Sequence, residues 1–145
     1  MDRTDEQHLR RAIELAAQAR AAGEQPFGSL LVGPQGDVLA EDRNTVVSDR
    51  DVTAHPELKL ARWAAAHLTA DVARATTMYT SCEPCAMCAN VIARAGLGRV
   101  VFALSAEQLA QLKPAGASPP DAWTALREGP ALFDEARRPV DGYYA

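Results

Sequence analysis

The sequence predicts a single α/β domain of three layers, in which helices cover both faces of a central sheet. The chain has 145 residues, which is enough for one compact core. Hydrophobic residues make up 48% and charged residues 23%, as in ordinary globular proteins. Segments of helix and strand character follow one another in the order α-β-β-α-β-α-β. We therefore expect residues 1–145 to form one domain.

The first predicted element is a helix that begins at Thr4. Thr4 and Gln7 have the spacing of a capping box, and Gly23 supplies a stop. Apolar residues at helical spacing predict the buried face: Leu9, Ile13, Ala16 and Ala17.

A β-hairpin is predicted next. The apolar run 27–32 precedes a turn with two glycines and a proline, and a second short strand follows at 38–40. A polar loop, 42–53, then leads to a second helix that begins near His55, with Pro56 in its first turn.

The second half of the chain alternates between strand and helix. Residues 76–80 have strand composition, and residues 84–95 predict a helix that Gly96 ends. The apolar run 100–104 is typical of a strand buried on both faces. Two further helices are predicted, over 105–112 and 121–128.

Composition excludes several classes of function. The net charge of -4 makes long nucleic acids poor partners, because proteins that neutralise phosphates usually carry positive charge. No apolar run approaches the roughly 20 residues that span a bilayer. The polar N-terminal segment has no signal-peptide core, so we expect a cytoplasmic protein without a membrane partner.

Three cysteines lie within one short segment, at Cys82, Cys85 and Cys88. An odd, clustered set is not a disulfide framework and indicates metal or redox chemistry. Cys85 and Cys88 share one face of a helix start, and His55 stands at the start of another helix. Zinc takes imidazole and thiolate ligands, and three protein ligands leave one position open for a water molecule. We expect one zinc ion per chain, held by His55, Cys85 and Cys88.

Glu57 stands two residues after His55 and predicts a proton shuttle. A carboxylate at that spacing can approach the water without binding zinc, take its proton and pass it to a leaving group. Zinc lowers the pKa of such a water to near neutrality. These groups together suit attack on an electron-poor carbon with loss of ammonia.

The motifs His55-x-Glu57 and Pro84-Cys85-x-x-Cys88 resemble the signature of zinc nucleobase deaminases. From about Phe27 to Leu104 the chain is similar to the cytidine deaminase-like superfamily, most of all to bacterial guanine deaminases. That second likeness rests on residues 26–28, 51–55 and 80–85. The tRNA adenosine deaminases share much of the pattern, but usually have an apolar residue where this chain has Cys82.

The resemblance implies a three-layer α/β/α fold with a mixed sheet of about five strands. It also implies a homodimeric hydrolase that converts guanine to xanthine and ammonia. Asn44 matches a family asparagine that binds the base or sugar, and Phe27 matches a residue that lies against the substrate ring. Tyr143 and Tyr144 are candidates for an aromatic residue that closes the site, sometimes in a neighbouring subunit. Glu107 or Asp121 could stand for an acidic proton-transfer residue of guanine deaminases.

Other functions remain open at this point. The substrate could be cytosine, isocytosine, a nucleoside, an aminotriazine or a pterin, or the adenosine of a tRNA. Cys85 and Cys88 could form a redox pair, although that would leave His55 and Glu57 without a role. A fourth ligand, Cys82, would close the site and make a catalytically silent zinc-binding domain.

Overall fold

The computed structural model describes residues 1–115 and 126–144. In the N-terminal half the elements are α1 (Arg3–Ala21), β1 (Gly28–Val32), β2 (Val38–Arg43), α2 (Val46–Asp49), α3 (Pro56–His67) and α4 (Ala70–Arg74). The second half contains β3 (Thr77–Cys82), α5 (Ala86–Ala95), β4 (Arg99–Leu104), α6 (Ala106–Leu112) and α7 (Phe133–Ala136). Among the described residues, no helix is long and apolar enough to cross a lipid bilayer.

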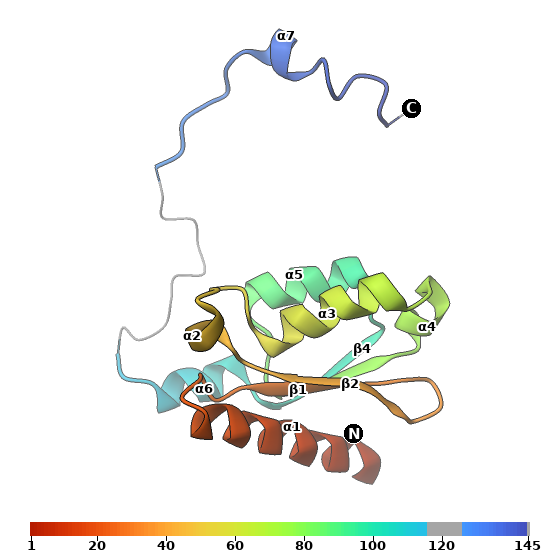
Figure 1. Ribbon diagram of the computed structural model, residues 1–145, viewed down its shortest axis with the longest axis vertical. Coiled ribbons are helices and arrows are strands. Elements are labelled where there is room, and N and C mark those ends of the chain that lie inside the picture. The colour runs from red at the N-terminus through yellow and green to blue at the C-terminus, as the bar shows by residue number, and fades with distance from the viewer. Residues whose placement is uncertain (116–125, 145) are drawn as a thin grey trace.

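The predicted three-layer α/β architecture is confirmed. The strands form one mixed sheet in the order β2-β1-β3-β4. β1 runs antiparallel to β2 and β3, whereas β3 and β4 are parallel. Figure 1 shows α1 beneath the sheet and the pair α3 and α5 above it.

The expected strand number was wrong, because the described residues form four strands rather than about five. After β4 the chain turns into α6, and residues 126–144 add no strand. β4 is therefore the edge of the sheet in the described part of the chain. Its burial is also less than the apolar run predicted, since Val101 is buried but Phe102 is 37% exposed.

Two apolar clusters fill the space on either side of the sheet. Leu30 faces α1 and Leu31 faces α3 and α5, because successive side chains of a strand point to opposite faces. The cluster under α1 contains Leu9, Ala12, Leu30, Val32, Tyr79 and Val101. The cluster under α3 and α5 contains Leu31, Leu60, Ala61, Ala64, Met78 and Ile92. This alternation decides which residues of β1 and β3 can reach the ends of α3 and α5.

The first helix begins earlier than predicted. Asp2 caps α1 and forms the capping box with Asp5, so the prediction from Thr4 and Gln7 was wrong. Each aspartate accepts a hydrogen bond from the backbone N–H of the other, which satisfies two donors at the helix start. Ile13 is 49% exposed, because Ala12 and Leu15 carry the buried face instead.

Gly28 sets how closely α1 approaches β1. A Cβ atom there would lie 2.5 Å from Leu15 Cβ and 2.7 Å from the carbonyl oxygen of Ala12. Only glycine fits such an approach of helix backbone to strand backbone. The contact fixes the start of β1, where Phe27 and Ser29 flank this glycine.

The helix starts that carry the motifs lie where the sequence predicted them. His55 is the N-cap of α3 with Pro56 at its first position, and Cys85 is the N-cap of α5. Gly96 ends α5 in the left-handed conformation. Ser105 and Gln108 form a capping box at α6. The helix predicted over 121–128 lies mostly outside the described residues.

Candidate metal centre and active site

Three potential metal ligands meet where the N-terminal ends of α3 and α5 lie together. His55 comes from the first helix, and Cys85 and Cys88 come from the second. Their donor atoms all lie within 4.8 Å of one another. A common set of apolar residues packs α3 and α5 together above the sheet, and this packing brings the two motifs into contact.

The distances between these atoms fit a tetrahedral zinc site. With Zn–S bonds of about 2.3 Å and Zn–N bonds of about 2.0 Å, sulfur and nitrogen ligands lie about 3.5 Å apart. His55 Nδ1 lies 3.7 Å from Cys85 Sγ and 3.5 Å from Cys88 Sγ. The nitrogen that faces the sulfurs is Nδ1, so a neutral ring that binds metal here carries its proton on Nε2.

The surroundings of Cys88 also suit a metal ligand. Its side chain is buried, and burial followed by the nearby Glu57 carboxylate raises the pKa of the Cys88 thiol. A thiolate in this place needs a cation to balance its charge, which bound zinc provides. Cys82 is buried at the end of β3 but is not part of the group of three ligands. Among the residues that the structure describes, three side chains thus lie close enough to hold one metal ion, and a tetrahedral ion with three protein ligands keeps one position for water.

Glu57 lies beside the ligands and is almost fully buried, with 6% of its surface exposed. Its Oε1 atom accepts hydrogen bonds from Ser29 Oγ at 3.1 Å and from Thr80 Oγ1 at 3.2 Å. The two hydroxyls are themselves 2.8 Å apart. A buried carboxylate usually needs such partners, because burial without hydrogen bonds would penalise its charge.

The sequence alone did not single out Ser29 and Thr80. Ser29 is the one polar side chain between Phe27 and Val32, and that is the signal that could have marked it. A polar residue inside a buried strand needs a partner, and here the partner comes from the helix above. The sequence gives no comparable signal for Thr80, because threonine is common in strands.

Backbone hydrogen bonds bring Phe27 and Asn44 to the same end of the domain as the ligands. The Asn44 N–H donates to the Phe27 carbonyl at 3.0 Å, and the Thr45 N–H donates to the Ala54 carbonyl at 3.1 Å. Ala54 immediately precedes His55. Phe27 is half-buried, whereas the Asn44 side chain is fully buried.

Two hydrogen bonds fix the orientation of the buried Asn44 side chain. Its Oδ1 atom accepts from the Val46 N–H at 3.0 Å, and its Nδ2 atom donates to Gln25 Oε1 at 3.2 Å. Nδ2 has a second hydrogen that this donation does not use. Glu24, next to Gln25, accepts from the backbone N–H groups of Val47 and Ser48, which ties α2 to the end of α1.

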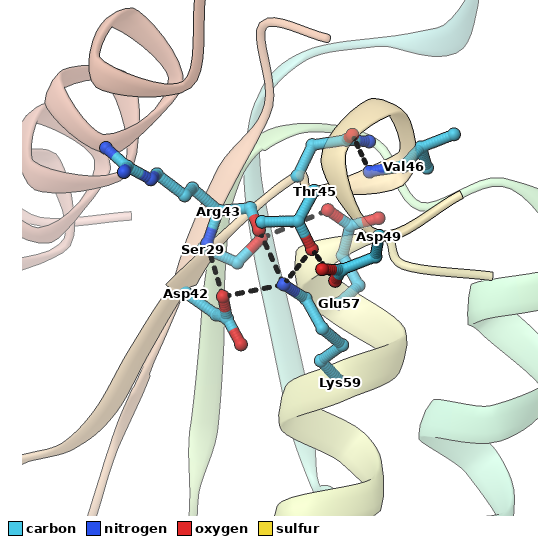
Figure 2. A network of polar contacts seen from close by, with 9 residues as sticks. Ser29, Asp42, Arg43, Thr45, Val46, Asp49, Glu57 and Lys59 are labelled. Atoms are coloured by element: carbon cyan, nitrogen blue, oxygen red, sulfur yellow. Dashed lines mark hydrogen bonds and ion pairs between the residues drawn. The ribbon is translucent and has the colours of Figure 1, made fainter. Parts of the chain in front are cut away.

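Lys59 joins α3 to the end of β2 and to the loop that follows it, as Figure 2 shows. Its Nζ atom donates to the Arg43 carbonyl at 2.8 Å and to Thr45 Oγ1 at 2.9 Å, and it pairs with Asp42 Oδ1 at 2.9 Å. Thr45 in turn donates to Asp49 Oδ2 at 2.6 Å. Asn44 lies between two residues that Lys59 holds, so this lysine fixes the position of the asparagine.

The remaining candidate residues are not brought to the ligands. Tyr143 and Tyr144 are 77% and 85% exposed and pack against each other with ring centroids 4.9 Å apart. They belong to residues 126–144, which lie away from the sheet and its helices in Figure 1. Glu107 is exposed in the first turn of α6, and Asp121 lies outside the described residues.

Comparison with known proteins gives a consistent result. Residues 2–104 match the family described as the cytidine and deoxycytidylate deaminase zinc-binding region. This stretch contains the three ligands, Glu57, and the residues of β1 and β3 that bond to it.

Three relatives show how varied the substrates of similar proteins are. A probable cytosine deaminase of Schizosaccharomyces pombe is 34% identical over 94% of this chain and 90% of its own length. A tRNA-specific adenosine deaminase of Haemophilus influenzae is 37% identical over 70% of this chain, but the match spans only 58% of that protein. The crystal structure of guanine deaminase from Bacillus subtilis has a TM-score of 0.78 and 30% identity, and the match covers 99% of this chain and 94% of that one.

Proposed function

The chain belongs to the family of cytidine and deoxycytidylate deaminase zinc-binding domains, and from this membership we propose that it deaminates a free nucleobase, with guanine as the substrate. At the level of its family it is a zinc-type deaminase of nucleobases or nucleosides, a hydrolase that acts on C–N bonds. The reaction proposed for guanine consumes water and yields xanthine and ammonia.

The observation that carries the proposal is the placement of Glu57 beside His55, Cys85 and Cys88. Ligand atoms 3.5 Å and 3.7 Å apart suit zinc, and the open fourth position leaves room for water. A buried carboxylate next to that position is the group that hydrolytic deamination requires. A redox pair would use the two thiols but would leave His55 and Glu57 without a role.

Zinc, when bound by these residues, supplies the positive charge that makes water acidic enough to attack near neutral pH. Glu57 accepts the proton that the attacking water loses as a C–O bond forms at the amino-bearing carbon. The same carboxyl group gives this proton to the ring nitrogen, then takes the proton of the newly added hydroxyl group and delivers it to the amine. The C–N bond breaks, ammonia leaves, and the base keeps an oxo group.

Support for guanine comes from the coverage of the structural match. The guanine deaminase of Bacillus subtilis aligns over 99% of this chain, including the segment after β4. Cytosine is the second candidate, since the Schizosaccharomyces pombe relative is 34% identical over nearly its full length. A tRNA substrate has less support, because the net charge is -4 and the match to the tRNA deaminase stops short of its full length.

We assign the base-binding contacts to Asn44 and Phe27. Asn44 would direct the amide hydrogen that Gln25 does not take toward an acceptor on the base. Phe27 is half-buried next to this asparagine and offers a ring on which a flat heterocycle can lie.

The tyrosines near the C-terminus would then serve a second copy of the chain. Tyr143 and Tyr144 are exposed on a segment that lies away from its own sheet. In a homodimer this segment could cover the site of the neighbouring subunit. Sedimentation velocity of the parent and of a Tyr143→Ala/Tyr144→Ala variant tests this, since a parent that is monomeric at all concentrations contradicts the arrangement.

Ammonia release from zinc-loaded protein tests the proposed function. The panel contains guanine, guanosine, cytosine, isocytosine, adenine, adenosine, a pterin, an aminotriazine and a tRNA, with Glu57→Gln as the control. Turnover of guanine that the control lacks supports the proposal. Turnover of cytosine or tRNA instead replaces the substrate but keeps the reaction, whereas zinc-loaded protein that releases no ammonia from any compound contradicts a deaminase.

A further inference from the structure

Two buried hydroxyl groups beneath the active site have no role in the mechanism described so far. We propose that Ser29 and Thr80 are positioning residues that hold the Glu57 carboxylate in one orientation by binding its Oε1 atom. The inference rests on the proposed function, because it assigns these residues to the step that Glu57 performs. It concerns the two central strands, not the ligand set or the substrate contacts.

The register of the sheet brings the two hydroxyls together. Ser29 of β1 and Thr80 of β3 are directly opposed in the antiparallel pair, although 51 residues separate them in the chain. Ser29 lies on the same face as Leu31, and Thr80 on the same face as Met78, because alternate residues of a strand share a face. Both Leu31 and Met78 pack toward α3 and α5. Ser29 and Thr80 therefore point at the first turn of α3, where Glu57 lies.

Neither hydroxyl is available to solvent. Ser29 and Thr80 are each 0% exposed, and the hydrogen bonds of their side chains run to each other and to Glu57. An alanine and a valine would fill similar volumes without polar groups to satisfy. Packing of the core therefore does not require these two hydroxyl groups, whereas the Glu57 carboxylate accepts hydrogen bonds from both.

Counting protons shows how the three groups share their bonds. Each hydroxyl has one proton to donate, and the ionised carboxylate has none, so the triangle of three contacts holds two hydrogen bonds at a time. Removing one hydroxyl leaves the other free to donate to Oε1. Only the loss of both leaves Oε1 without either donor. The two residues should therefore substitute for each other in part.

Binding through a single oxygen constrains rotation of the carboxylate. When both hydroxyls hold Oε1, the second oxygen, Oε2, is kept in a fixed direction for proton transfer. Proton transfer depends on the distance and angle between the carboxylate and the attacking water, so a rotated group would act less often. Since the proposed contacts that hold the base are Asn44 and Phe27 and the proposed role of Glu57 is proton transfer, we expect this constraint to affect kcat rather than KM.

The test compares Ser29→Ala, Thr80→Val, Thr80→Ser and the Ser29→Ala/Thr80→Val double variant, all loaded with zinc. Thr76→Val is the matched control, because Thr76 is also 0% exposed but donates its hydroxyl to the Val72 carbonyl, away from the site. Steady-state rates are measured with the best compound of the panel. Zinc content and melting temperature are measured for every variant.

Each single removal should lower kcat by roughly tenfold, and the double variant by more than the product of the two, toward the roughly 10²- to 10⁴-fold that proton transfer contributes. KM and zinc content should stay at the parent values. Thr80→Ser should restore kcat, because it returns the hydroxyl. Thr76→Val should keep kcat even where its melting temperature falls. If the double variant fails to fold, the contrast between Thr80→Val and Thr80→Ser decides the matter.

Crystal structures of the zinc-loaded parent and of the double variant give a readout that needs no substrate. The parent should keep Glu57 Oε1 within hydrogen-bond distance of both hydroxyls, and the carboxylate of the double variant should turn or occupy more than one rotamer. A double variant with the carboxylate orientation of the parent, or with its kcat, overturns the inference. A parent that is inactive on the whole panel overturns the proposed function instead, and the carboxylate orientation still decides the positioning role.

Discussion

Cys88 Sγ lies 3.5 Å from His55 Nδ1, although 33 residues separate the two in the chain. The distance matches what a shared tetrahedral zinc ion would impose on a sulfur and a nitrogen ligand. Packing of α3 against α5 and the sheet holds the two atoms at this separation. The apolar core between the sheet, α3 and α5 thus places the candidate ligands. Mutation of a ligand should therefore remove the metal and leave this packing in place.

Removal of one ligand should abolish zinc binding while the fold persists. His55→Ala and Cys85→Ala each leave two ligands, and zinc sites with two protein ligands bind far more weakly. Elemental analysis of the purified variants measures the loss. Cys82→Ala is the matched control, since Cys82 lies outside the ligand group and should leave zinc content unchanged. Equal zinc in His55→Ala and the parent would refute the ligand set, and loss of zinc in Cys82→Ala would make Cys82 a fourth ligand.

Glu57→Gln should keep zinc and lose turnover. Glutamine preserves the size of the side chain and can still accept hydrogen bonds from Ser29 and Thr80, but it cannot take a proton from water. A general acid-base group of this kind contributes roughly 10²- to 10⁴-fold to the rate, so kcat should fall within that range. The measurement is ammonia release alongside zinc content. A folded, zinc-loaded variant with the parent's rate would remove Glu57 from the mechanism.

The motifs could be predicted from sequence because each stands at a helix start with its own local signal. Pro56 marks the start of α3, and the spacing of Cys85 and Cys88 places both on one face of α5. The α1 cap was misplaced by two residues, since Asp2 competes with Thr4 and the pattern does not rank them.

The contacts that support the motifs could not be predicted in the same way. Ser29 and Thr80 are 51 positions apart in the chain, and their pairing depends on the register between β1 and β3. From the sequence, Lys59 looks like an exposed helix residue. Its contacts with Arg43 and Thr45 exist only in the folded structure. The exposure of Phe102 follows from the position of β4 at the sheet edge, which an apolar run does not reveal.

Lys59→Met should weaken substrate binding more than it slows the chemical step. The substitution removes the contacts of Nζ with Asp42, Arg43 and Thr45 and so releases the segment that contains Asn44. We expect KM to rise by roughly tenfold, as for loss of a positioning interaction worth about 1.4 kcal/mol, with zinc content unchanged. Arg62→Met is the control, because Arg62 lies exposed on the same helix. An unchanged KM would separate Lys59 from the substrate contact assigned to Asn44.

Stability at acid pH should depend on Asp5, far from the metal ligands. Two hydrogen bonds from Arg99, each 2.8 Å long, and one from the Tyr79 hydroxyl at 2.6 Å hold the pKa of Asp5 well below its ordinary value of 3.8. Because the pKa in the folded state is the lower one, the ionised carboxylate stabilises the fold at every pH above the ordinary value. This contribution is lost as the pH falls below about 4, where the unfolded chain binds the proton first.

Urea unfolding of the parent and of Asp5→Asn between pH 7 and pH 3 measures this dependence. The free energy of unfolding of Asp5→Asn should be lower at pH 7. The difference from the parent should shrink as the pH falls toward 3, because Asp5 of the unfolded parent binds a proton there that the folded parent does not. Asp71→Asn is the matched control, since the Asp71 side chain is 92% exposed in its ion pair with Arg74 and exposed pairs contribute little. A constant difference between parent and Asp5→Asn across this range would show that Asp5 acts through shape and helix capping rather than through its charge.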